Sequence, residues 1–148
     1  MGRTLLTGAS GYLGQRLLQQ LIRTEEPMLI PLRAASAAEF ARRQQKILRA
    51  LPEKSHRQVE FVHGDLSSLR EILKSKTDEI DRVVHNAAVT AFNVDEETAN
   101  RVNRDGTVEM LKLAQQCSRL QQFLYVSTVY ASGMSAGVIE EKIFDPRP

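Results

Sequence analysis

The sequence predicts a doubly wound α/β fold, in which about five parallel strands carry helices on both faces. Three observations indicate this class. Short apolar runs alternate with segments of helical periodicity five times along the 148 residues. The runs are almost continuously apolar, as is typical of parallel strands that are buried on both faces. A glycine-rich turn joins the first run to the first helix.

The composition excludes several other classes of protein. Hydrophobic residues make up 42% and charged residues 26%, which excludes disorder as the main state. A formal net charge of +2 favours neither nucleic acid nor an anionic membrane as partner. Cys117 is the single cysteine, which excludes a disulfide framework and is typical of a reducing compartment. No apolar run approaches the roughly 20 residues of a membrane span, and no signal-peptide pattern is visible, so we expect one cytoplasmic domain.

The first half of the chain contains the first crossover. An apolar run predicts a strand over 3–7, and leucines at helical spacing predict a helix over about 12–24. A second strand is expected over 28–32, although it contains Pro31. Because proline has no N–H to donate, Pro31 either interrupts this strand or lies where no partner needs that N–H.

The next segments continue the alternation. Ser36 is the expected N-cap of a helix over about 37–50, with apolar residues on one face and basic residues on the other. Residues 52–57 are expected to form a solvated loop. A third strand is predicted over 59–62.

The remaining elements are a short helix, two strands and a long helix. Ser67 or Ser68 is expected to cap the short helix. The last strands are predicted over 82–85 and 122–126, and the long helix between them over about 96–119. We predict no periodic segment after this point.

The glycine turn between the first strand and the first helix predicts a nucleotide site. Gly8, Gly11 and Gly14 are spaced three apart. Gly8 suits a tight turn, Gly11 allows close approach of a ligand, and Gly14 allows the helix to pack against the strand. The helix that follows presents unpaired N–H groups and a positive dipole end, which suit a pyrophosphate. A glycine-rich turn without a ligand is the alternative, and the strand–turn–helix context favours binding.

The end of the second strand indicates which dinucleotide binds. NAD sites usually place a carboxylate there to hold the ribose hydroxyls, whereas this chain has Arg33. A guanidinium suits a 2′-phosphate, so we expect NADP(H) rather than NAD(H). Arg42 or Arg43 could supply a second cation, and the alternative is that these arginines form a solvated helix face.

Taken together, the motifs resemble the extended short-chain dehydrogenase/reductase superfamily, and they are most similar to its thioester-reductase and fatty-acyl-reductase branch. The segments that carry the resemblance keep the family's order across nearly the whole chain: LTGASGYLG (6–14), LRA (32–34), GDLS (64–67), HNAA (85–88), NRDGT (103–107) and FLYVSTVY (123–130). The resemblance implies a Rossmann-type fold and a dinucleotide held by the turn, at Gly8, Ser10, Gly11, Tyr12, Leu13 and Gly14.

The resemblance also implies further cofactor contacts. Asp65 and Leu66 would line the adenine pocket, although Asp65 could equally be the N-cap of the next helix. Ala87 and Ala88 would pass under the cofactor, where small side chains permit close approach. Asn103 would lie in the long helix near the active site, where it would hold a water or kink the helix.

Thr128 is the catalytic candidate that the resemblance implies. Its hydroxyl, beside that of Ser127, would donate a hydrogen bond to the substrate carbonyl at the end of a central strand. The alternative is that both hydroxyls are satisfied by the backbone.

The tyrosine and lysine that such enzymes use for proton transfer, four residues apart, are absent from this sequence. Tyr12, Tyr125 and Tyr130 are followed at that spacing by arginine, valine and methionine. We therefore expect residues 1–148 to be the amino-terminal part of a reductase domain, ending before the Tyr-x-x-x-Lys helix and the substrate lobe. An acyl-thioester carrier is a possible partner of the parent protein. The alternatives are a nucleotide-sugar epimerase or dehydratase fragment, and a dinucleotide-binding module without turnover.

Overall fold

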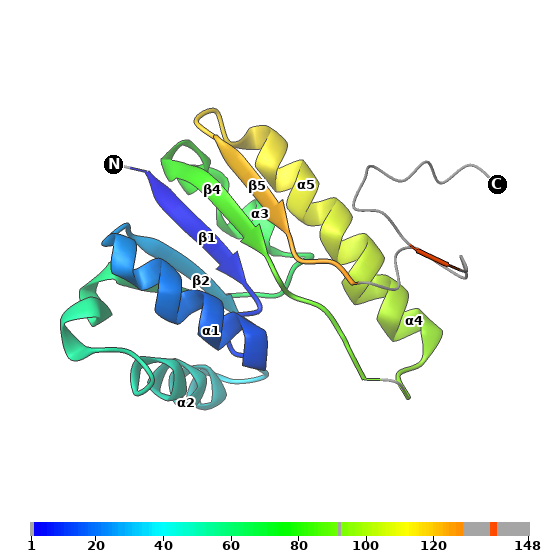
Figure 1. The fold of residues 1–148 in the computed structure, drawn as a ribbon, viewed down its shortest axis with the longest axis horizontal. Coiled ribbons are helices and arrows are strands. Elements are labelled where there is room, and N and C mark those ends of the chain that lie inside the picture. The colour runs from blue at the N-terminus through cyan, green and yellow to red at the C-terminus, as the bar shows by residue number, and fades with distance from the viewer. Residues whose placement is uncertain (1, 92, 129–136, 139–148) are drawn as a thin grey trace.

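The computed structural model describes residues 2–91, 93–128 and 137–138, and it confirms the expected doubly wound architecture (Figure 1). In this part of the chain, five parallel strands form one sheet in the order β3-β2-β1-β4-β5. The strands are β1 (Arg3–Thr7), β2 (Met28–Leu32), β3 (Val59–His63), β4 (Ile80–His85) and β5 (Gln122–Tyr125). The helices are α1 (Tyr12–Leu21), α2 (Ala37–Leu48), α3 (Leu69–Ile72), α4 (Glu96–Ala99), the π-helical segment η4 (Asn100–Asp105) and α5 (Gly106–Gln116).

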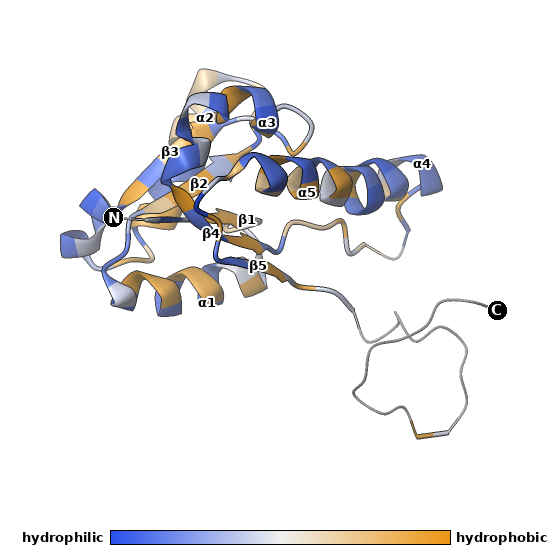
Figure 2. Ribbon diagram, turned by 90° about the horizontal axis from the view of Figure 1, so that it is seen from above, coloured by the Kyte–Doolittle hydropathy of each residue, from blue (hydrophilic) through white to orange (hydrophobic). Residues whose placement is uncertain are grey.

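Helices bury both faces of the sheet. Leu5 and Leu6 are neighbours on β1 and point to opposite faces, as successive strand residues do. Leu6 belongs to a core with Leu18 of α1 and Ile47 of α2, whereas Leu5 packs with Leu113 of α5. Figure 2 shows the sheet lying between α1 and α5. This double burial explains why the strand sequences are continuously apolar.

Pro31 lies inside an uninterrupted strand, so the second of the two expected possibilities is confirmed. The pairing of β2 with β1 extends only as far as Leu29, while its pairing with β3 continues to Leu32. The carbonyl of Leu32 points toward β3, where it accepts from the N–H of Gly64 at 3.2 Å. Consecutive residues of a strand direct their backbone N–H and C=O groups to alternate sides, so the backbone nitrogen of Pro31 faces β1. Because the pairing with β1 ends at Leu29, no partner needs an N–H at this position.

Several boundaries differ from the predictions. A 3₁₀ helix, Glu53–Gln58, replaces the expected loop at 52–57, and the His56 ring fixes it by bonding the Leu48 carbonyl at 2.9 Å. The predicted helix over 96–119 is α4, η4 and α5 in succession. It ends early because Cys117 adopts extended backbone angles and turns into the core, where burial raises the pKa of its thiol to about 11.

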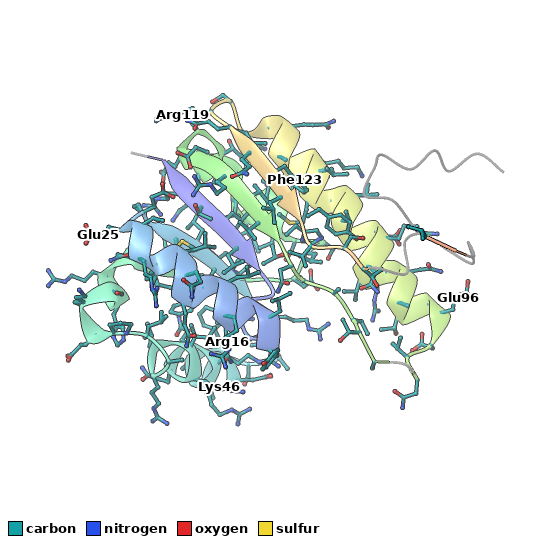
Figure 3. All side chains as sticks on the ribbon, in the orientation of Figure 1. Arg16, Glu25, Lys46, Glu96, Arg119 and Phe123 are labelled. Carbon is teal, nitrogen blue, oxygen red and sulfur yellow. The ribbon has the colours of Figure 1, made fainter. Side chains whose placement is uncertain are left out.

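The last strand forms one edge of the sheet in the described residues. Leu124 and Tyr125 of β5 are 40% and 48% exposed, while Phe123, labelled in Figure 3, packs against the α5 side of the core. None of the described helices is long and apolar enough to cross a membrane. Over the same residues, no cluster of three or more His, Cys, Asp or Glu side chains is arranged to hold a metal ion.

Candidate functional site

Three groups of predicted site residues lie at the carboxyl ends of three neighbouring strands. The glycine turn (residues 8–14) follows β1, residues 86–88 follow β4, and Thr128 follows β5. Because all strands are parallel and β4 lies between β1 and β5, these segments lie side by side at the carboxyl-terminal end of the sheet. Open α/β sheets bind their ligands at this end.

Two glycines of the turn are required by close backbone packing. Gly8 has a φ of +72°, and a Cβ there would lie 2.8 Å from the backbone nitrogen of Ala87. A Cβ on Gly14 would lie 2.0 Å from the carbonyl oxygen of Gly8. Any larger residue at either position therefore displaces the turn, the β4 exit or the start of α1.

Gly11 is different, because its surroundings within the chain are open. A Cβ at Gly11 would meet only the carbonyl oxygen of Gly8, at 3.4 Å. Gly11 is the exposed N-cap of α1, no side chain caps this helix, and its first turn contains no acidic residue. The N–H groups and the positive dipole end of α1 consequently face open space. Such a helix N-terminus suits a pyrophosphate, and a side chain at Gly11 would project into the space that it needs.

Three further turn residues flank this opening. Ser10 is exposed, and Tyr12 and Leu13 at the start of α1 are 83% and 47% exposed. The Tyr12 ring lies beside the guanidinium of Arg16, whose carbon is 5.9 Å from the ring centroid. Large apolar side chains standing in solvent beside a predicted anion site are available to contact a ligand.

A buried histidine links the turn to the end of β4, and the sequence analysis did not single it out. Thr7 accepts hydrogen bonds through its hydroxyl oxygen from the N–H groups of Asn86 and Ala87, both at 3.1 Å. That hydroxyl lies 2.8 Å from Nδ1 of His85, which is fully buried. Since the oxygen already accepts twice, its proton is donated to Nδ1.

The other ring nitrogen connects to the long helix. Nε2 of His85 lies 3.0 Å from the hydroxyl oxygen of Thr107, and this hydroxyl donates to the carbonyl of Asn103 at 2.7 Å. Nε2 therefore carries the imidazole proton. Every donor in this chain of hydrogen bonds then has an acceptor, which holds only for a neutral ring in this tautomer.

Burial of the His85 ring also favours its neutral form. It lowers the pKa of His85 from 6.5 to about 4, because no carboxylate compensates the cost of desolvating an imidazolium. The Tyr125 ring stacks on the imidazole with centroids 5.5 Å apart. The HNAA segment contains the only sequence signal for this residue, a histidine at the end of an apolar strand.

Asn103 lies in the π-helical segment η4, and its amide is occupied by the chain itself. Its oxygen accepts from the N–H of Val89 at 2.8 Å, and its nitrogen donates to the carbonyl of the same residue at 3.0 Å. The expected kink at this residue thus takes the form of a π segment, which is frequent at functional sites. Asn103 fixes the loop that begins with Ala87 and Ala88.

Ser68 is the N-cap residue of α3, as one of the two expected serines, but the side chain that accepts from the N–H groups before this helix is that of Asp65. One carboxylate oxygen of Asp65 accepts from the N–H groups of both serines, at 3.1 and 3.3 Å, and from the Ser67 hydroxyl at 2.6 Å. These bonds hold the pKa of Asp65 below its usual value. Leu66 packs against the start of α5, where a Cβ on Gly106 would lie 2.5 Å from it.

The two candidate cations differ in their surroundings. Arg33 follows β2 directly and is exposed, and within the described residues it has no ion-pair partner. Arg43 lies on α2, where its guanidinium forms an ion pair with Glu39 at 2.7 Å. The structure therefore leaves the Arg33 guanidinium available to a ligand and engages that of Arg43.

Thr128 and Ser127 lie three and two residues beyond β5 and are both exposed. The N–H of Val126 donates to the carbonyl of His85 at 2.9 Å, which keeps this segment alongside the end of β4. Tyr130 lies outside the described residues.

Comparison with known proteins identifies the family. Residues 6–148 match the NAD-binding family described as Male sterility protein. The chain belongs to this family. Fatty acyl-CoA reductase 1 of Xenopus laevis is 27% identical over 158 residues, which cover 96% of this chain and 30% of the relative. The expected resemblance to the fatty-acyl-reductase and thioester-reductase branch is thus confirmed.

Solved structures agree with this assignment to the Male sterility family. The terminal R domain from the myxalamid PKS-NRPS pathway has a TM-score of 0.80 and 30% identity, covering 98% of this chain and 40% of that one. A thiolation-reductase di-domain from an archaeal non-ribosomal peptide synthetase has a TM-score of 0.74 and 27% identity, covering 89% and 37%. A Bacillus cereus UDP-glucuronic acid 4-epimerase, 21% identical with a TM-score of 0.70, shows only the shared fold. The chain spans about a third of the length of the curated relatives it matches.

We predict that Gly11→Val weakens dinucleotide binding about tenfold or more without unfolding the chain, because the space around Gly11 is open until a pyrophosphate enters it. Calorimetric titration with NADPH measures the affinity, and circular dichroism measures folding. Gly14→Ala is the contrasting variant, since its Cβ collides with Gly8 in the free chain and should lower stability. Wild-type affinity in folded Gly11→Val would refute the site.

The depressed pKa of His85 predicts that stability falls with acid. Between pH 6.5 and 4 the unfolded chain binds a proton at His85 that the folded chain excludes, so the stabilisation is complete above pH 6.5 and is lost below it. The loss approaches about 1.4 kcal/mol per pH unit. Urea unfolding of wild type and His85→Gln from pH 7 to 5 measures the two slopes. Equal slopes would contradict a neutral buried imidazole.

Proposed function

We propose that this chain is the NADP(H)-binding portion of a reductase that acts on an acyl thioester. The glycine turn carries the proposal. It has space for a ligand at Gly11 but none for a side chain at Gly8 or Gly14, and it lies at the same end of the sheet as Thr128. The match to an NAD-binding family supports binding of a nicotinamide dinucleotide. The names of the similar proteins, fatty acyl-CoA reductase and terminal R domain, support the thioester substrate.

Arg33 supports NADP(H) over NAD(H). It stands at the end of β2, where a dinucleotide site receives the ribose of the adenosine, and the residues that directly follow this strand, 33–35, include no acidic residue to hold the ribose hydroxyls. Its guanidinium is exposed and can form two charge-assisted hydrogen bonds with a 2′-phosphate. We further propose that Asp65 and Leu66 line the adenine pocket of this site and that Ala87 and Ala88 pass under the cofactor.

Thr128 is the proposed carbonyl-binding residue. Its hydroxyl would donate a hydrogen bond to the thioester or aldehyde oxygen, which gains negative charge as the bond order falls. The bound nicotinamide would supply the hydride. Asn103 would act indirectly, by holding the Val89 loop. The 148 residues contain no Tyr-x-x-x-Lys pair to supply the proton, so the proposal assigns that group to a segment outside them.

The substrate would be presented by a carrier or by coenzyme A. The similar di-domain joins a thiolation domain to its reductase, which supports a carrier-bound acyl group as one source. A second candidate function is dinucleotide binding without turnover, and the missing Tyr-x-x-x-Lys pair favours it for the isolated chain. Arg33 and the names of the relatives weigh against a nucleotide-sugar enzyme.

The cofactor proposal predicts tighter binding of NADPH than of NADH. Arg33→Asp should weaken NADPH about tenfold to a hundredfold, because charge-assisted bonds to the 2′-phosphate are lost. Calorimetric titration with both cofactors measures the change. Lys46→Asp is the matched control, since Lys46 is an exposed cation on α2 and its reversal changes the net charge equally. Equal affinity of wild type for both cofactors would show that the preference is wrong.

The reductase proposal predicts that the isolated chain oxidises NADPH with acyl thioesters at no enzymatic rate, because a positioned acid is worth about 10²–10⁴-fold. Extension through its downstream reading frame should restore turnover. In that longer protein, Thr128→Val should lower kcat about a hundredfold, whereas Thr128→Ser keeps the hydroxyl and most of the activity. Absorbance at the NADPH band follows the reaction. Robust turnover by the short chain would contradict the assignment of the acid.

A further inference from the structure

We propose that His63, Glu39 and Arg43 are positioning residues that set the preference for a 2′-phosphate by holding the Ala34–Ala35 peptide group in the loop that carries Arg33. The inference rests on the proposed function, in which Arg33 binds the phosphate. It assigns to Arg43 a different role from the direct contact that the sequence suggests. It also gives His63, which no motif contains, a part in cofactor choice.

The peptide group between Ala34 and Ala35 is held at both ends. Its carbonyl oxygen accepts from Nε2 of His63 at 2.9 Å, and its N–H donates to a carboxylate oxygen of Glu39 at 2.8 Å. Because a carbonyl can only accept, Nε2 of His63 carries a proton. One side chain comes from the end of β3 and the other from α2, so the peptide plane is fixed from two directions.

The peptide group on the other side of Arg33 is held by the backbone. The carbonyl of Leu32 accepts from the N–H of Gly64 at 3.2 Å, which continues the ladder between β2 and β3 by one bond. Arg33 and Ala34 thus lie between two held peptide groups, while the Arg33 side chain is exposed. A guanidinium on a fixed backbone loses less conformational entropy when it binds a planar, bidentate ligand.

Glu39 is in turn oriented by its neighbours on α2. Its second carboxylate oxygen accepts from Nε and Nη2 of Arg43, at 2.9 and 2.7 Å. Its own N–H donates to the hydroxyl oxygen of Ser36, the N-cap, at 3.2 Å. The Ala35 N–H, which is the largest cause, and the Arg43 guanidinium together hold the pKa of the Glu39 carboxyl below its usual value. Arg43 therefore acts on the Arg33 loop through Glu39.

The His63 ring is also held in place. It packs on Phe40 of α2, with ring centroids 4.9 Å apart and planes tilted by 32°. Since the ring is otherwise exposed, this contact and the Ala34 carbonyl are what orient it. α2 and the end of β3 consequently form a single support for the loop that carries Arg33.

The direction in which NADPH affinity changes when the Glu39 carboxylate is removed distinguishes positioning of Arg33 from simple charge repulsion. Removing the Glu39 carboxylate takes a negative charge away from the neighbourhood of a phosphate, which by Coulomb's law alone would tighten NADPH binding. If Glu39 positions Arg33, its removal weakens NADPH binding instead. NADH has no 2′-phosphate and should be unaffected in either case.

The experiment titrates the full chain with NADPH and NADH by calorimetry. His63→Leu and Glu39→Ala should each raise the Kd for NADPH about three- to tenfold, the range expected for one lost hydrogen bond, and leave the Kd for NADH unchanged within about twofold. His63→Gln keeps an N–H donor and should restore most of the affinity. Arg43→Met should weaken NADPH in the wild type and add nothing in the Glu39→Ala background. Melting temperatures report folding.

Other outcomes would contradict either the positioning role or the cofactor preference. If wild type prefers NADPH through Arg33 but His63→Leu and Glu39→Ala keep that preference, the positioning role is wrong and the cofactor proposal stands. If wild type binds both cofactors equally, both proposals fail. Equal weakening of NADPH and NADH would show general damage to the site and would refute the positioning role. A further loss from Arg43→Met in the Glu39→Ala background would show that Arg43 touches the phosphate directly.

Discussion

At Gly8 and Gly14 a Cβ atom has no room, because the turn after β1 packs its backbone directly on the end of β4 and on the start of α1. Most features of the site depend on this close approach. It brings the N–H groups of Asn86 and Ala87 within reach of the Thr7 hydroxyl.

The polar groups buried by this packing are satisfied through one histidine. His85 accepts from Thr7 on one side and donates to Thr107 on the other, and so connects the glycine turn with the long helix. The arrangement requires a neutral ring in one tautomer. Asn103, four residues before Thr107, binds the loop after β4 from the same helix. The turn, the β4 exit and η4–α5 therefore behave as one connected support beneath the proposed cofactor.

Parts of the site could be predicted from the sequence because they depend on local chemistry. The glycine spacing follows from the geometry of a strand–turn–helix connection, and the Ser36 cap from the preference of helix N-termini for a hydroxyl. The role of His85 could not be predicted, since its two partners lie 78 and 22 residues away in the chain. The bond from His63 to Ala34 likewise joins residues 29 positions apart.

The sequence alone determined the class of fold, the order of its elements and the place of the turn, because hydrophobic periodicity and glycine spacing are local consequences of backbone geometry. The tertiary structure decided which side chains work together. It joined His85 to Thr7 and Thr107, brought His63 to the carbonyl of Ala34, and linked Asn103 of the π segment to the loop after β4. These contacts depend on which strands become neighbours, and only the folded sheet brings the carboxyl ends of those strands together.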